Sequence, residues 1–302
     1  MEDIRQELSL GKMDKILVRE PSRYHIGLII PDVEDSFFRD LIQGIEGSAP
    51  EADGVVQVFR YSGSFEQDAS FYFEVCLRSG VDGVVVYIPR GANAGEFREK
   101  AVQAGVVLVT VGMDRPKDYA GGYIGSSSLQ QGFEAGKVVA GTLGNNARIG
   151  VLLAATENGS SQLDPFYRGV ASAVAVYGKA KISFLSRPPS GPFSGEEAAA
   201  TLLEKNQGIN ALICSTAFDT EGAAQVVVDR NLVGKVLIVG ADETESIRRY
   251  LSKGVILASI QRDSRRIGEE VIQEFRRRTN GNPPSPPREI GFRITKGKEL
   301  KL

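Results

Sequence analysis

The strongest constraint on the fold of this 302-residue chain is an alternation of short apolar runs with segments of helical spacing. The alternation begins at Tyr24 and continues almost to the C-terminus. Short β-branched runs bounded by turn residues are typical of buried strands. The predicted strands are His25–Ile30, Val55–Tyr61, Gly83–Ile88, Val106–Val111, Ile149–Ala154, Ile182–Leu185, Ala211–Cys214, Val236–Val239 and Val255–Ile260. Because these strands alternate with helices, the sequence predicts parallel sheets that are covered by helices on both faces.

Helical spacing is clearest in two of the intervening segments, where an apolar residue recurs at every fourth position. These residues are Phe37, Leu41 and Ile45 in the first segment, and Ile267, Val271 and Phe275 in the second. Each set forms one apolar stripe along a helix, so the spacing predicts an amphipathic helix over each segment.

The alternation is too long for one sheet, and the chain is long enough for two domains of ordinary size. Three places are candidates for crossings between the domains. The segment Gly121–Ser128 (GGYIGSSS) indicates a short strand followed by a Ser-rich helix start. A second crossing is expected near Gln261–Asp263, and the Pro-rich stretch Asn282–Pro287 precedes a last predicted strand, Glu289–Ile294.

Charge and motif content argue against several classes of function. Thirty-six basic residues against 38 acidic ones give a formal charge of −2, which argues against a nucleic-acid-binding surface spread over the fold. The chain has no dinucleotide-binding G-x-G-x-x-G after a strand, no phosphate-binding loop and no G-x-S-x-G elbow. Its one histidine, His25, lies inside a predicted strand, where it is unsuited to act as a general base, zinc ligand or haem ligand. We therefore expect no enzymatic activity, no metal and no cofactor.

The cysteines and the N-terminus leave the cellular compartment open. Cys76 and Cys214 lie inside apolar runs, so we expect buried free thiols, with a disulfide as the alternative. Residues 1–23 are polar and lack the pattern of a signal peptide. No stretch approaches the length of about 20 apolar residues that a membrane span needs. Either the protein is cytoplasmic or its sequence begins after a removed export signal.

Polar residues follow the ends of several predicted strands. They are Asp35, Arg90, Asn93, Thr216, Asp219, Asp242 and Gln261. In open parallel sheets, ligands bind at the carboxyl ends of the strands, where the loops leave the sheet. Carboxylates, amides and a guanidinium group suit sugar hydroxyls, and Phe37 and Phe38 offer an aromatic face for the apolar side of a sugar ring. These polar and aromatic residues form the predicted ligand-binding site.

Several of these side chains also have a purely structural interpretation. Phe37 and Phe38 open an amphipathic helix and could pack in the core. Asp35 could cap that helix, and Asp242 could cap a helix that begins near Thr244.

The same alternative applies to the remaining polar positions. Thr216 and Asp219 could cap a helix that begins at Thr220. Arg90 could be a solvated loop charge. Gln261 directly follows a long apolar run, and a polar residue at that point indicates a binding site or a hinge.

The segment YHIGLIIPDVEDSFFRDLIQGIEGSA (24–49) is similar to the first strand, loop and helix of the type I periplasmic sugar-binding proteins. The effector domains of lac-type repressors share this module. Four more blocks follow in the family's order: DGVVVYIPRGAN (82–93), YIGSSSLQQGFEAG (123–136), ALICSTAFDTEGAA (211–224) and KVLIVGADETESIRRYLSKGVILASIQRDSRRIGEE (235–270). The resemblance implies two doubly wound parallel-sheet lobes joined by a three-segment hinge. Residues 24–125 plus 263–288 would form the N-terminal lobe, 126–262 plus 289–302 the C-terminal lobe, and 1–23 a tail or spacer.

The sequence departs from the family at three of its usual ligand-binding positions. Asp164 or Phe166 falls where many sugar-binding relatives carry an arginine. Thr216 stands in the place of a usual Asn or Asp, and Ser127 stands where an acidic residue is frequent. These differences leave open which sugar binds, and whether the ligand is a sugar at all.

The resemblance implies a monomeric receptor that closes by a hinge motion around a small polar ligand, expected to be a sugar. The expected partner is the permease of an ABC importer or a membrane sensor. Such a receptor works in the periplasm or elsewhere outside the cytoplasm, associated with the membrane, so its export signal would be missing from the given sequence.

The alternative is the effector-binding domain of a lac-type transcription regulator. The 23 residues before Tyr24 are too few for a three-helix DNA-binding head. They also carry five basic and five acidic side chains, whereas DNA binding needs net positive charge. We therefore expect no nucleic-acid partner for the given sequence.

Overall fold

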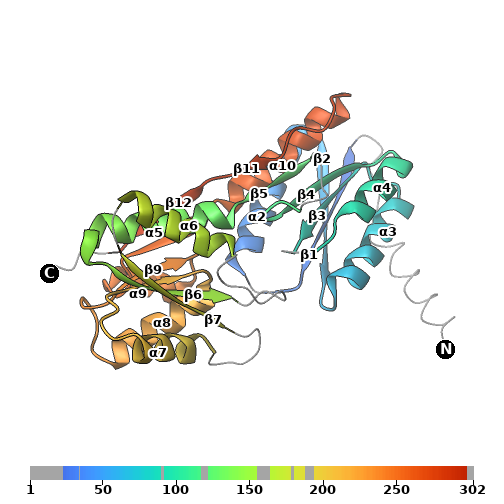
Figure 1. Cartoon of the computed structure of the whole chain (residues 1–302). Helices are drawn as coiled ribbons and strands as arrows, with labels where there is room; N and C mark the ends of the chain where they lie inside the picture. The colour runs from blue at the N-terminus through green and yellow to red at the C-terminus, as the bar shows by residue number, and fades with distance from the viewer. Residues whose placement is uncertain are drawn as a thin grey trace, which may run out of the picture. The chain divides into compact units, whose positions relative to one another are not determined.

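The computed structural model describes residues 23–33, 35–89, 92–116, 122–154, 164–177, 180–187 and 194–297. The chain folds into two units, each built from two separate stretches of sequence (Figure 1). The first unit comprises Met1–Gly125 and Ser264–Arg288, and the second comprises Ser126–Asp263 and Glu289–Leu302. Each unit contains a six-stranded sheet between helices, so the predicted α/β class is confirmed.

The sheet of the first unit has the strand order β11-β5-β4-β3-β1-β2, in which β1 to β4 are parallel. Helices α2 (Ser36–Ser48) and α10 (Ser264–Thr279) pack together on one face, and α3 (Ser70–Arg78) and α4 (Gly95–Ala104) lie on the other (Figure 1). A 3-10 turn spans Ala49–Ala52 and a π-helical turn spans Phe65–Ala69. The strands are β1 (Tyr24–Pro31), β2 (Gly54–Tyr61), β3 (Gly83–Ile88), β4 (Val107–Met113), β5 (Tyr123–Ser126) and β11 (Arg288–Glu289).

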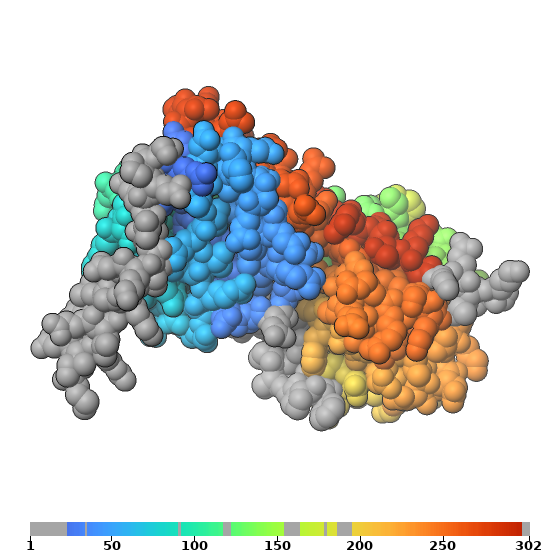
Figure 2. Space-filling view, turned by 180° about the vertical axis from the view of Figure 1, so that it is seen from behind, coloured from blue at the N-terminus to red at the C-terminus, as the bar shows by residue number. Residues whose placement is uncertain are grey.

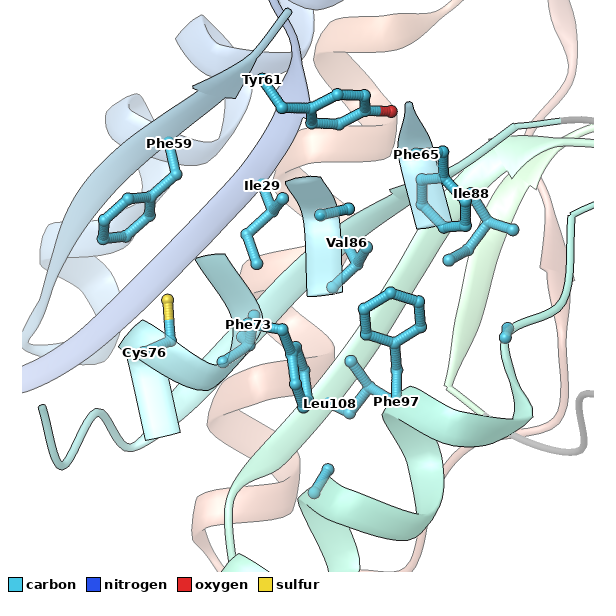
Figure 3. Close-up of a cluster of buried hydrophobic side chains, with 14 of the residues drawn as sticks. Ile29, Phe59, Tyr61, Phe65, Phe73, Cys76, Val86, Ile88, Phe97 and Leu108 are labelled. Atoms are coloured by element: carbon cyan, nitrogen blue, oxygen red, sulfur yellow. The ribbon is translucent and has the colours of Figure 1, made fainter. Parts of the chain in front are cut away.

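The core of the first unit includes a cluster of buried side chains between the sheet and helices α3 and α4 (Figure 3). Every second residue of a strand points to the same face, which brings Ile29, Val86 and Leu108 into this cluster. Phe73 from α3 meets Phe97 from α4 edge to face, with ring centroids 5.0 Å apart. The aromatic residues fill the space between helices and sheet that the shorter aliphatic side chains leave.

The sheet of the second unit has the order β12-β10-β9-β8-β6-β7. Helices α5 (Ser128–Leu143) and α6 (Pro165–Tyr177) pack on one face, and α7 (Ser194–Lys205), α8 (Ala217–Asp229) and α9 (Glu245–Ser252) on the other. The strands β6 to β10 are parallel, whereas β12 is antiparallel to β10. Figure 2 shows the red surface of this last strand beside the orange surface of the second unit. The strands are β6 (Arg148–Ala154), β7 (Lys181–Arg187), β8 (Ala211–Cys214), β9 (Leu237–Ala241), β10 (Ala258–Arg262) and β12 (Phe292–Lys296).

Each predicted strand overlaps a strand of the structure, but two boundaries were wrong in a way that matters for the site. The strand predicted over Val255–Ile260 is β10, which begins at Ala258 and ends at Arg262. Val255 and Ile256 instead donate their N–H groups to the carbonyl of Tyr250, so they close helix α9. The last strand, predicted over Glu289–Ile294, is divided, because the chain leaves the first sheet after β11 and enters the second at β12.

The two apolar stripes are confirmed, since all six of their side chains are buried. These side chains belong to α2 and α10, the two helices that pack together in the first unit. Most polar residues of the same helices lie at or near the surface, whereas Ser264 and Glu274 of α10 are buried.

The two cysteines are free and buried, as predicted, and they lie in the cores of different units. Burial raises the pKa of the Cys76 thiol to about 12. Burial also raises the pKa of Cys214 well above its ordinary value. Both thiols are therefore protonated at neutral pH.

We expect neither cysteine to react with Ellman's reagent in the native protein, because the thiolate is the reactive form. After denaturation without a reductant, both thiols should react. Fewer than two reactive thiols under denaturing conditions would contradict the free state of the cysteines.

Candidate functional site

The strand order places several predicted site residues beside the points where each sheet changes its winding direction. In the first unit this point lies between β1 and β3, and in the second between β6 and β8. Loops that leave the carboxyl ends of such neighbouring strands diverge and leave room for a ligand. Asp35 and Asn93 follow β1 and β3, and Thr216 follows β8. The residues 155–163 that follow β6 lie outside the described part of the chain.

In the first unit, Asp35 and Asn93 are exposed and make local hydrogen bonds. The backbone N–H of Phe37 donates to Asp35 Oδ1 at 2.8 Å, so Asp35 caps helix α2, as its structural alternative predicted. The backbone N–H of Gly95 donates to Asn93 Oδ1 at 2.8 Å. Arg90, the predicted guanidinium of this half of the site, lies outside the described residues.

Phe37 and Phe38 are only 3% and 5% exposed, which confirms their predicted packing in the core. The rings of both lie edge to face with Tyr87 of β3, with centroids 5.8 and 4.8 Å away. Tyr87 was not among the predicted residues, although it lies one residue before the end of the strand that leads to Arg90. A role of the two phenylalanines in ligand binding stays a prediction.

In the second unit, Thr216 and Asp219 form a cap on helix α8. The Thr216 hydroxyl accepts from the Asp219 N–H at 3.1 Å and donates to Asp219 Oδ2 at 2.6 Å. Asp219 is fully buried. The predicted capping is therefore confirmed, but the helix begins at Ala217 rather than at Thr220.

Asp242 directly follows β9 and forms a bidentate ion pair with Arg262 at the end of the neighbouring strand β10. Arg262 Nε donates to Asp242 Oδ1 at 2.9 Å, and Arg262 Nη2 donates to Oδ2 at 2.8 Å. The side chains of Asp242 and Arg262 are 15% and 12% exposed. Two parallel donors on one carboxylate fix both its position and its plane.

The structural alternative for Asp242 was wrong, because Asp242 does not cap the following helix. Helix α9 is capped by Thr244, whose hydroxyl accepts from the N–H of Ile247 at 3.1 Å. The backbone of Asp242 has a φ of 57°, a left-handed conformation that Asp and Asn tolerate better than most residues. The carboxylate is therefore turned toward Arg262.

Gln261 lies inside β10, one residue before its end, and not beyond the strand as predicted. Its side chain is 4% exposed, and Nε2 donates to Thr295 Oγ1 of β12 at 2.8 Å. This bond joins the last two strands of the sheet. Contact of Gln261 with a ligand stays a prediction.

The other two positions that depart from the family pattern hold helix caps, as Thr216 does. Asp164 Oδ1 accepts from the N–H of Phe166 at 2.8 Å, and Ser127 Oγ accepts from the N–H of Gln130 at 3.4 Å. Phe166 is buried in the core of the second unit. Asp164 and Ser127 therefore cap the N-termini of α6 and α5, respectively.

The site residue that the sequence reasoning missed is Arg262. One signal was available: β9 and β10 are consecutive parallel strands, so their carboxyl ends lie at the same edge of the sheet. An acidic residue after one end and a basic residue at the next predict an ion pair across this edge. The misplaced end of β10 concealed the signal, because it left Arg262 outside the strand.

A groove of 530 Å³ in the second unit lies at the opposite end of the sheet from Asp242. Its lining includes Leu237 at the start of β9, Ala258 at the start of β10, and Lys137 and Val138 of α5. Because the predicted residues lie at the carboxyl ends of these strands, this groove is separate from the predicted site.

Within the described ranges, no group of three or more His, Cys, Asp or Glu side chains is arranged to hold a metal ion. Across the same residues, no helix combines the length and apolar character needed to cross a membrane.

Known proteins resemble the chain over most of its length. The D-allose-binding periplasmic protein of Escherichia coli (strain K12) is 21% identical in an alignment of 253 residues that covers 80% of this chain and 80% of the other. The solved glucose-galactose binding protein GanP from Geobacillus stearothermophilus is 21% identical, with a TM-score of 0.77 over 93% of this chain and 99% of the other. A sugar-binding protein of a sugar ABC transporter from Bacillus halodurans is 16% identical, with a TM-score of 0.78 over 90% and 97%.

These two solved structures share the fold of the two units described above. A family model described as "Periplasmic binding protein domain" matches residues 26–283, which include almost all of the strand–helix alternation. The chain therefore belongs to the family of the periplasmic binding protein domain.

Proposed function

We propose that this protein is a solute-binding receptor that takes an uncharged sugar or related polyol at the carboxyl ends of its two sheets. The observation that carries the proposal is the fixed carboxylate of Asp242, which Arg262 holds in a bidentate pair at the end of β9. A carboxylate has four lone-pair directions, and the pair uses two of them. The other two suit neighbouring hydroxyl groups of a sugar.

The relatives support this class of ligand by their names. One is the D-allose-binding protein of Escherichia coli. Solved binding proteins of this fold from Actinobacillus succinogenes, Burkholderia graminis and Agrobacterium vitis are described with D-allose, D-arabinose and α-D-tagatopyranose, respectively. We infer that the ligand of this chain is a pentose, a hexose or a compound of similar size.

We infer that the receptor works outside the cytoplasm and passes its ligand, or the signal of its presence, to a membrane partner. Several solved relatives are described as solute-binding proteins of ABC transporters, and another, XylFII, is described in a complex with LytSN. The relatives therefore include binding proteins of transporters and one binding protein in complex with a second protein. These binding functions favour a receptor over an enzyme or a transcription regulator.

Thermal unfolding with a panel of D-allose, D-arabinose, D-tagatose, D-glucose and D-galactose tests the proposal. We expect at least one sugar to raise the melting temperature, because a ligand at about 100 times its Kd adds about 2.7 kcal/mol of stability. In Asp242→Asn the rise should largely disappear at the same concentration. Hydrogen bonds to a charged group contribute about 1.5–3 kcal/mol each, so the affinity should fall at least about tenfold.

Asparagine is the sharper substitution at this position because it tolerates the left-handed backbone of Asp242, whereas alanine would add backbone strain. Asp53→Asn is the matched control, since Asp53 is an exposed aspartate with a φ of 48° in the first unit. The control should keep the full sugar-induced rise. A panel in which no sugar changes the melting temperature would contradict the proposed ligand class.

A further inference from the structure

The backbone around Asp242 is held from two neighbouring elements. The Asp242 N–H donates to the carbonyl of Ile260 at 3.2 Å, and its carbonyl accepts a hydrogen bond from Ser259 Oγ, so β10 holds both backbone groups. The preceding N–H, of Ala241, donates to the hydroxyl of Thr220 in α8 at 3.0 Å. Asp242 therefore leaves β9 with little freedom in its main chain.

The remaining freedom of Asp242 lies in its two side-chain torsions, and the bidentate pair with Arg262 restrains both by fixing the place and the plane of the carboxylate. The outer torsion of an aspartate side chain is broad and has no sharp preference of its own. The bidentate pair, with two bonds of 2.8 and 2.9 Å, sets this torsion. Arg262 is itself held in place by the strand that it ends.

We propose that Arg262 is a positioning residue for ligand binding, because it orients the Asp242 carboxylate so that its remaining lone pairs meet the ligand. This inference rests on the proposed function. A group fixed before the ligand arrives loses less conformational freedom on binding, which raises affinity without any new contact. Arg262 thus acts through Asp242 and need not touch the ligand.

The test measures Kd by calorimetry with the sugar of the panel that raises the melting temperature most. We expect Arg262→Gln to weaken binding about tenfold, which corresponds to about 1.4 kcal/mol. Arg262→Lys keeps the charge but cannot form the bidentate pair, so it should recover only part of the affinity. Arg293→Gln is the matched control, because Arg293 is an exposed arginine on the neighbouring strand β12 and should change Kd less than about twofold.

A double-mutant cycle separates positioning from a general structural role. In an Asp242→Asn background, Arg262→Gln should change Kd less than about twofold, because the group that Arg262 positions is already lost. Full additivity of the two substitutions overturns the inference. An Arg262→Gln variant that lowers the melting temperature but keeps the wild-type Kd also overturns the inference. Tighter sugar binding by this variant overturns it as well, because it would mean that Arg262 competes with the ligand.

A crystal structure of ligand-free Arg262→Gln keeps this test independent of the proposed function. We expect the Asp242 carboxylate to take more than one orientation there, and a single orientation as in the wild type overturns the inference. If no sugar of the panel binds the wild type, the proposed function fails, while this structure still decides whether Arg262 positions Asp242.

Discussion

Replacing Gly132 by alanine is expected to lower the free energy of unfolding by about 3 kcal/mol, one of the largest effects of a single methyl group in this protein. Gly132 lies in the first half of α5, where that helix packs against α6. A Cβ at this position would overlap the backbone carbonyl of Phe166. A backbone carbonyl cannot avoid the overlap by changing rotamer, as a flexible side chain can. The two helices would therefore have to separate.

The close contact is made from both helices, so we expect that a small shift of one helix cannot remove the overlap. A Cβ on Gly169 of α6 would overlap the backbone carbonyl of Leu129 in α5. The two glycines thus let the backbones of the helices approach from both sides. Moving α5 outward would also disturb Val139 and Ala135, which pack on the sheet of the second unit.

Gly141→Ala is the matched control, because Gly141 lies in the same helix and a Cβ there would meet no atom within 4 Å. Alanine is favoured over glycine inside a helix by about 0.5–1 kcal/mol, so this variant should be as stable as the wild type or more so. Urea unfolding monitored by circular dichroism gives both values. Equal stabilities of the Gly132 and Gly141 variants would show that α5 and α6 are not packed this closely.

The sequence predicts the alternation of strands and helices well because burial on both faces of a parallel sheet requires continuous apolar runs. Gly83–Ile88 and Ala211–Cys214 were predicted to the residue. The prediction failed at Val255 and Ile256, where an apolar run serves two purposes, closing α9 and then entering β10. The role of Gly132 could not be predicted at all, because it depends on which helix lies beside α5.

The sequence predicted that polar residues lie at the strand ends, but it did not predict their hydrogen bonds and ion pairs. Strand ends located Asp242 and Thr216, because parallel sheets gather their carboxyl ends at one edge. The residue types that bind sugars also cap helices, so the sequence could not separate the two roles of Asp35 and Thr216. The ion pair of Asp242 with Arg262 depends on the register of β9 and β10. The predicted end of β10 was two residues too early, so the sequence analysis did not place Arg262 beside Asp242.

A second large loss of stability is expected for Glu274→Gln, about 3 kcal/mol at neutral pH. Glu274 lies in the last part of α10, and its side chain is fully buried. Arg277 donates to both of its oxygens at 3.0 and 3.1 Å, and Arg288 donates to Oε2 at 3.2 Å. The backbone N–H and the hydroxyl of Ser285 donate at 2.9 and 2.5 Å.

Every partner of Glu274 named above is a donor, which is why a neutral amide is a poor replacement. The amide NH₂ of glutamine would face donors of Arg277, Ser285 or Arg288 and leave them without an acceptor, a costly state for buried groups. Ser285 and Arg288 belong to the stretch that returns from α10 to β11, so the loss would loosen this return. Glu269→Gln is the control, since Glu269 is a half-exposed residue of the same helix in a weak pair with Arg265, and should change stability less than about 0.5 kcal/mol.

The effect should also depend on pH in a defined direction. Burial alone would raise the pKa of Glu274, but hydrogen bonds from Arg277 and Ser285 outweigh it and hold the pKa below its ordinary value of 4.5. A carboxylate with a lowered pKa stabilises the fold fully above its ordinary pKa, and this stabilisation is lost as the pH falls through the lowered value. The difference in urea midpoint between wild type and Glu274→Gln should therefore be largest at neutral pH and shrink below pH 4.5. A difference that stays constant into acid would mean that the ionised form of Glu274 is not what the three donor residues stabilise.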